Sequence, residues 1–209
     1  MIELLASVPA YALATFLIVI VPGQGMAMVL KQALISGRAH AFASVLGNST
    51  GLIVWGATSA VGLSAIFASS DVAYAVLKYT GVAYLFYVGT ATAVSALRGN
   101  GKFNTSDGAK ETSYASSFRL GLITNLTNVK AAVYAVAFTP QFVPRDFSLG
   151  LGVFLLVCLW AVISTSTYAV IVTAVMRVTH LLESESARTK LTWVSAVGIY
   201  LLGIGILFS

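Results

Sequence analysis

Six long apolar stretches constrain the fold of this chain more than any other feature. Four carry no charged residue, and each of the other two is interrupted by a single lysine, Lys78 or Lys130. A membrane-spanning helix needs about 20 predominantly apolar residues, and each stretch is close to that length or longer. The stretches are residues 4–30, 41–70, 72–97, 120–144, 147–176 and 191–209. The sequence therefore predicts an all-α integral membrane protein with six transmembrane helices.

The composition supports a membrane protein and narrows its chemistry. Charged residues make up 9% of the 209-residue chain, against about 25% in a soluble domain, which excludes a soluble globular enzyme and a disordered chain. The net charge of +5 does not indicate a nucleic-acid binder, because the basic residues are spread along the chain. One cysteine, Cys158, and two distant histidines make no metal-ligand set, so we expect no metal and no cofactor.

Lysines and arginines are distributed unevenly among the connections between the apolar stretches. Nine of the twelve flank the first, third and fifth connections. These nine are Lys31, Arg38, Arg98, Lys102, Lys110, Arg119, Arg177, Arg188 and Lys190. Because cytoplasmic loops are enriched in basic residues, we expect these connections to be cytoplasmic. Both termini then lie outside the cytoplasm, with the chain in the inner (plasma) membrane.

The long polar stretch at the third connection divides the chain into two groups of three helices. Within a single membrane domain of residues 1–209, we expect a first repeat over 1–97, a cytoplasmic loop over 98–117 and a second repeat over 118–209. Each group has an odd number of helices, so two groups of the same fold enter the membrane in opposite orientations. The sequence thus predicts two inverted three-helix repeats, which is the plan of many transporters.

Two apolar stretches contain segments that can break a helix. Pro22 has no amide hydrogen and clashes with the preceding turn, and Gly23 and Gly25 relax the backbone after it. The fourth stretch contains TNLTNVK at residues 124–130, whose asparagine and threonine side chains can compete for backbone groups. A plain proline kink and a set of interhelical hydrogen bonds are the alternative interpretations of these two segments.

Lys130 lies about 16 Å into the fourth stretch, near the middle of the bilayer. A lysine at this depth costs about 3 kcal/mol to insert and usually faces the interior of the helix bundle. Two interpretations remain open. The amine pairs with a substrate carboxylate, or it caps carbonyl groups of a neighbouring broken helix. Lys78 lies nearer the end of its stretch, where its amine can reach the membrane surface.

Polar or irregular residues from four stretches share this central depth, which predicts one central polar site. Packing is the alternative for part of the set, because Gly47 and Gly51 have the GxxxG spacing that lets another helix approach. The hydroxyl groups of residues 164–167 can likewise bond to their own helix. The candidate substrate-binding residues are Pro22, Gly23, Gln24, Asn48, Asn125, Asn128, Lys130 and Thr165.

Short motifs along the chain resemble those of the LysE/RhtB family of amino-acid exporters. They follow the family's order and span most of residues 15–145. The motifs are Pro22-Gly23, Ser36-Gly37-Arg38, Gly47, Gly62-Leu63, residues 77–89 (LKYTGVAYLFYVG), residues 118–121 (FRLG), residues 125–131 (NLTNVKA) and residues 140–143 (PQFV). Each motif alone is weak, but all of them in order are specific.

The resemblance implies a membrane transporter that exports an amino acid or a close derivative. A helix N-terminus freed after Pro22 and Gly23 can bind a carboxylate through its amides, and Lys130 adds positive charge. The sequence departs from the family pattern at Gln24, where a second proline is usual, and at Val129, where the family usually has proline between asparagine and lysine. It also lacks the aspartate that many members carry after the glycines of the second helix.

A small channel or ion transporter of the same architecture is the alternative function. No acidic residue lies within any apolar stretch, which disfavours a cation pathway. An intramembrane enzyme needs a catalytic pair, and no such motif stands out. If export is by proton antiport, Lys130 is the remaining proton carrier, because every acid and both histidines lie at helix ends or in loops. The expected partners are an amino-acid substrate and the lipid bilayer, with no nucleic acid; a homodimer is left open.

Overall fold

The computed structural model describes residues 2–20, 23–67, 71–97, 113–175, 177 and 184–207. Every regular element among these residues is helical, as expected for an all-α protein. In chain order the elements are α1 (Ile2–Ile20), α2 (Gln24–Ile35), α3 (Arg38–Phe67), α4 (Asp71–Leu97), α5 (Tyr114–Leu126), α6 (Val129–Val133), η1 (Tyr134–Phe138, a π-helical turn), η2 (Thr139–Phe142, a 3-10 turn), α7 (Leu149–Thr173) and α9 (Glu185–Leu207).

The chain is interrupted at both segments that carry helix-breaking residues. Helix α1 is described as far as Ile20, and α2 begins at Gln24, directly after Gly23 in an extended conformation, so a new helix starts there. Between α5 and the helical segment that follows it, the axis bends by 58°. No proline is needed there, because Asn128 adopts an extended conformation and its side chain accepts a hydrogen bond from the Lys130 amide at 3.1 Å. A side-chain cap of this kind starts a new helix.

Helix α5 begins at Tyr114, inside the stretch that we assigned to the cytoplasmic loop. Ser113 is the cause, because its side-chain oxygen accepts a hydrogen bond from the Ser116 amide at 3.1 Å and caps the first turn. The connection between α2 and α3 turns at Gly37, whose φ of 91° is the left-handed conformation that favours glycine. Lys78 belongs to α4, but its side chain lies outside the described part of the structure.

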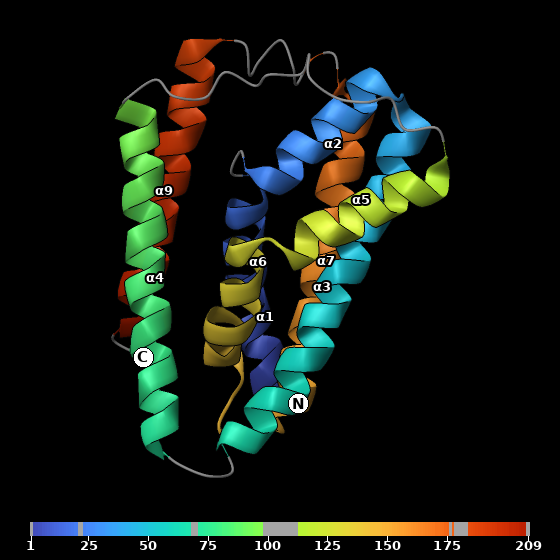
Figure 1. Cartoon of the computed structure of the whole chain (residues 1–209). Coiled ribbons are helices and arrows are strands. Elements are labelled where there is room, and N and C mark those ends of the chain that lie inside the picture. Colours follow the sequence, from blue (N-terminus) through green and yellow to red (C-terminus); the bar gives the residue numbers. More distant parts are fainter. Residues whose placement is uncertain are drawn as a thin grey trace.

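The helices form two groups with a broken segment between them (Figure 1). Helices α3, α5 and α7 pack together, and α4 packs along α9 as a separate pair. Helices α1 and α6 lie side by side between these groups. The α2–α3 connection and the start of α5 lie at the upper end of the view, and both chain termini lie toward the other end.

Large apolar side chains cover much of the exposed surface, on α1, α3, α4, α7 and α9. Within the described residues, two helices are long and apolar enough to cross a membrane, over Glu3–Ile20 and Leu149–Thr173. A third crossing results if α5 and the bent segment after it are counted together. The protein is therefore an all-helical membrane protein with apolar spans.

Candidate substrate site

The site begins with a carbonyl group that the sequence leaves without a helical partner. In an α-helix, the carbonyl of Ile18 would accept from the amide of residue 22. Residue 22 is proline, which has no amide hydrogen. The Lys130 amine donates to this carbonyl instead, with Nζ 3.1 Å from the oxygen. A positive charge also complements the negative end of the α1 dipole. The structure thus contains the capping arrangement that was one of the two interpretations of Lys130.

The N-terminus of α2 faces the same place. Gly23 precedes the helix in an extended conformation and provides no side-chain cap. Gly25, in the first turn, has almost no space around it, because a β-carbon there would lie 2.7 Å from the Tyr168 hydroxyl oxygen. The α2 N-terminus, with its partial positive charge and free amides, therefore lies beside Tyr168.

A pair of asparagines forms the floor between α3 and α5. The Asn125 amide nitrogen donates to Asn48 Oδ1 at 3.2 Å, and both side chains are buried. The Trp55 indole donates to the Asn125 main-chain carbonyl at 3.4 Å. Asn125 Oδ1 is buried and has no hydrogen-bond partner in the described protein. A buried acceptor without a partner is costly unless a water or a ligand satisfies it.

One face of α7 forms the remaining wall. Trp160, Ser164 and Tyr168 are spaced four residues apart and are all buried at the site. None of the three is among the candidate residues predicted from the sequence. Their i, i+4, i+8 spacing of side chains with polar atoms was the available signal, but the apolar composition of α7 obscured it.

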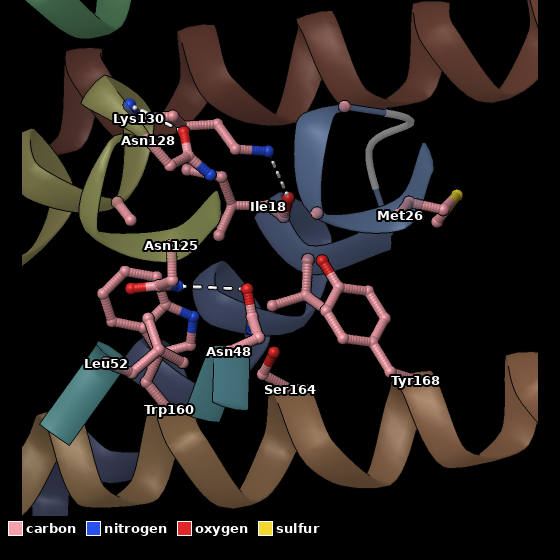
Figure 2. A pocket seen from close by; sticks show the side chains of 14 residues that line it. Ile18, Met26, Asn48, Leu52, Asn125, Asn128, Lys130, Trp160, Ser164 and Tyr168 are labelled. Carbon is pink, nitrogen blue, oxygen red and sulfur yellow. Dashed lines mark hydrogen bonds between the residues drawn. The ribbon is translucent and has the colours of Figure 1, made fainter. Parts of the chain in front are cut away.

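These four sides line a half-open cavity of about 30 Å³. Its lining residues are Ile18, Val19, Gly23, Gly25, Met26, Asn48, Leu52, Asn125, Asn128, Lys130, Ala131, Trp160, Ser164 and Tyr168. A cavity of this size holds about two water molecules. None of these lining residues, all from the described part of the chain, carries a carboxylate. Figure 2 shows the Lys130 amine and the Tyr168 hydroxyl directed into one part of the cavity, with Ile18 between them.

The structure brings together five of the eight candidate residues from the sequence. Gly23, Asn48, Asn125, Asn128 and Lys130 line the cavity.

Of the other three candidates, Gln24 and Thr165 are not among the cavity-lining residues. Gln24 is exposed at the start of α2. Thr165 bonds to Ser49 Oγ at 2.6 Å and to the Ala161 carbonyl at 2.7 Å, so its hydroxyl joins α7 to α3. Pro22 lies outside the described residues.

Comparisons with known proteins place this chain among membrane proteins. A family model described as LysE type translocator matches residues 16–209. An uncharacterized membrane protein of Bacillus subtilis, YrhP, is 26% identical over 98% of this chain and 97% of its own length. The homoserine/homoserine lactone efflux protein of Salmonella typhi is 32% identical over 64% of this chain and 63% of its own length. No solved structure matches. The match over nearly the whole chain establishes that this protein belongs to the LysE type translocator family.

Proposed function

We propose that this translocator exports an amino acid, or a derivative of similar size, from the cytoplasm across the inner membrane. The observation that carries the proposal is the Lys130 amine, which lies at a cavity with no carboxylate among its described lining residues. A cation within a membrane protein usually pairs with an anion or with carbonyl groups. A substrate carboxylate would therefore compete with the Ile18 carbonyl for the amine.

Two further groups support a carboxylate subsite at this position. The α2 N-terminus can donate main-chain amides to an anion, because Gly23 provides no side-chain cap for them. The Tyr168 hydroxyl lies against that turn and can donate a hydrogen bond to the same carboxylate, in addition to the Lys130 amine and the main-chain amides. Charge-assisted bonds of this type are about twice as strong as neutral ones. The subsite thus combines one charge, one helix dipole and one hydroxyl.

The opposite side of the cavity suits the amino group of the same substrate. Asn125 Oδ1 is a buried acceptor without a partner in the described residues, and an ammonium or hydroxyl group can donate to it. The residues that the structure describes around the cavity include no acid to pair with a basic side chain, whereas Leu52 and Trp160 provide apolar surface. We therefore propose a substrate with a small neutral side chain. The names of the Salmonella relatives, homoserine/homoserine lactone efflux proteins, favour the same class.

The cavity must widen during transport, because about 30 Å³ accommodates water but not an amino acid. We propose that residues 1–97 and 118–209 form two inverted three-helix repeats, joined by the cytoplasmic loop. The basic connections are then cytoplasmic and both termini are extracytoplasmic. The placement of both termini away from the α2–α3 connection supports this topology. Reporter fusions at Ser209 and within residues 98–112 test this topology. Activity at the C-terminus of a reporter that functions only in the cytoplasm would refute it.

Counterflow in proteoliposomes tests the transport function. Vesicles loaded with unlabelled homoserine should transiently accumulate external labelled homoserine above equilibrium, because a carrier exchanges substrates across one alternating site. A channel lets the label equilibrate without this overshoot, so the same trace separates the two functions. Lysine should not compete with the label. Absence of counterflow with homoserine, its lactone and other small neutral amino acids, in vesicles that contain folded protein, would refute the proposal.

A further inference from the structure

Four hydrogen bonds join α1 to the segment formed by α6, η1 and η2, and we call this set the α1 ladder. The bonds join Ser7 Oγ to the Phe142 carbonyl (2.8 Å), Tyr11 Oη to Thr139 Oγ1 (3.2 Å), Thr15 Oγ1 to Tyr134 Oη (2.9 Å) and Lys130 Nζ to the Ile18 carbonyl (3.1 Å). As residue numbers rise along α1, they fall along the other segment. The two segments are therefore antiparallel neighbours, as Figure 1 shows for α1 and α6.

Helix geometry explains how the ladder forms. On α1 its residues are spaced by four, four and three positions, which places them on one face. On the other segment, Tyr134 and Thr139 are five positions apart and would point about 140° away from each other on an α-helix. The π-helical turn brings both toward α1, and Thr139 Oγ1 donates to the Tyr134 carbonyl at 2.9 Å to stabilise that turn. Single π-turns of this kind occur frequently at functional sites.

The middle of the ladder is buried, and each of its bonds uses at least one side-chain group. Tyr11, Thr15 and Thr139 are 0% exposed, and Tyr134 is 2% exposed. Aromatic rings fill the space between the bonds, with Tyr11 and Phe142 centred 5.3 Å apart. A contact made by a few hydroxyl groups can separate and re-form without refolding either segment.

The contact between α3 and α5 is of another kind. There, a β-carbon on Gly47 would overlap the Phe118 main-chain carbonyl, so the two backbones touch directly. A direct backbone contact of this kind cannot loosen by exchanging side-chain partners. The two interfaces therefore differ in how easily they can open.

We infer that the α1 ladder is the gate between the cavity and the extracytoplasmic side, and that Lys130 connects this gate to the substrate. The inference rests on the proposed function and topology, which place the N-terminal end of α1 outside the cytoplasm. Lys130 belongs both to the ladder and to the cavity lining. A carboxylate that takes the Lys130 amine removes the innermost bond and leaves three neutral ones. Substrate binding then favours opening of the ladder toward the outside.

Thiol labelling measures gate opening without relying on transport. Replacing the single cysteine by Cys158→Ser gives a cysteine-free background, in which Ser164→Cys places one thiol at the cavity. A membrane-impermeant thiol reagent applied from the extracytoplasmic side then reports access through the ladder. Adding Thr15→Val with Tyr134→Phe removes one hydroxyl pair, which should raise the labelling rate roughly fivefold, as expected for the loss of one neutral hydrogen bond.

The chain offers a matched control for this double variant. Thr90 Oγ1 and Tyr200 Oη form a hydrogen bond of 2.6 Å between α4 and α9, so Thr90→Val with Tyr200→Phe removes the same chemistry away from the ladder. This control should leave labelling unchanged. Equal labelling rates in the two double variants, both shown to be folded by gel filtration, would overturn the gate whether or not homoserine is transported. A rise seen only from the cytoplasmic side would overturn the assigned side.

A tether tests whether the ladder must open for transport. Ser7→Cys with Phe142→Cys, joined by a bifunctional thiol reagent, should abolish counterflow and retain binding of labelled substrate in detergent. The control tether, Thr90→Cys with Tyr200→Cys, should leave counterflow intact. Unimpaired counterflow with the first tether closed would overturn the inference while leaving the transport function standing.

Discussion

The crossing of α3 and α5 permits the sharpest test of the fold, because two glycines meet there reciprocally. A β-carbon on Gly47 would lie 2.8 Å from the Phe118 carbonyl carbon and 2.9 Å from the Leu122 amide nitrogen. A β-carbon on Gly121 would lie 2.7 Å from the Ser44 carbonyl carbon. The obstructing atoms are backbone, so no rotamer change can relieve either clash. We expect Gly47→Ala and Gly121→Ala each to force the helices apart.

The magnitude follows from two opposing effects. Alanine in place of glycine favours a helix by about 1 kcal/mol, whereas overpacking a close contact costs typically 1–3 kcal/mol and sometimes more. Gly62 isolates the first effect, because it lies on the same helix as Gly47 and a β-carbon there meets nothing within 4 Å. Gly62→Ala should therefore be neutral or slightly stabilising, while Gly47→Ala and Gly121→Ala should be less stable than Gly62→Ala by about 1–3 kcal/mol or more.

Thermal melting of the purified protein in detergent, followed by gel filtration of the surviving fraction, measures the difference. For a chain of this length, 1 kcal/mol corresponds to a shift of roughly 2–4 °C in Tm, so the crossing variants should melt about 2–12 °C below Gly62→Ala. If Gly47→Ala and Gly62→Ala had the same Tm, the direct backbone contact between α3 and α5 would be refuted.

Three further predictions concern the site. Lys130→Met should weaken homoserine binding roughly 10- to 100-fold, the value of a charge-assisted hydrogen bond. Binding of homoserine lactone, which has no carboxylate, should be unchanged. Competition in counterflow measures both affinities, and equal losses would contradict the carboxylate role of Lys130. Gly51→Ala should weaken binding, because a β-carbon there would lie 2.7 Å from that of Asn125 and displace its amide. Unchanged binding of labelled substrate would count against Asn125 as a ligand. If export is proton antiport, a pH gradient at zero membrane potential should drive substrate flux in the wild type, Asp71→Asn and Asp146→Asn. The same gradient should drive no flux in Lys130→Met. Loss of pH-driven flux in either aspartate variant, with substrate binding intact, would identify that carboxylate as the proton carrier.

Much of the site could be predicted because it depends on residues that are neighbours in the sequence. Pro22 removes an amide that the Ile18 carbonyl needs, whatever the rest of the chain does. Asn128 can cap a new helix through its own side chain, and this local property accounts for the break after α5. The start of α5 was less well predicted, because the polar composition of residues 98–117 indicates a loop, whereas one residue, Ser113, caps the helix.

The sequence by itself determined the apolar stretches, the membrane environment and the two weak points in the helices, since each depends on residues that are neighbours in the chain. Only the tertiary structure decided which groups satisfy the freed backbone. Lys130 reaches a carbonyl 112 positions away, and Tyr168 lies beside α2 because Gly25 leaves room for its hydroxyl. The α1 ladder likewise depends on a π-helical turn that no pattern in the sequence predicted. The local sequence shows which backbone group lacks a hydrogen-bond partner, whereas the identity of its new partner depends on how closely the helices pack. At the α3–α5 crossing, that distance is set by two glycines from different halves of the chain.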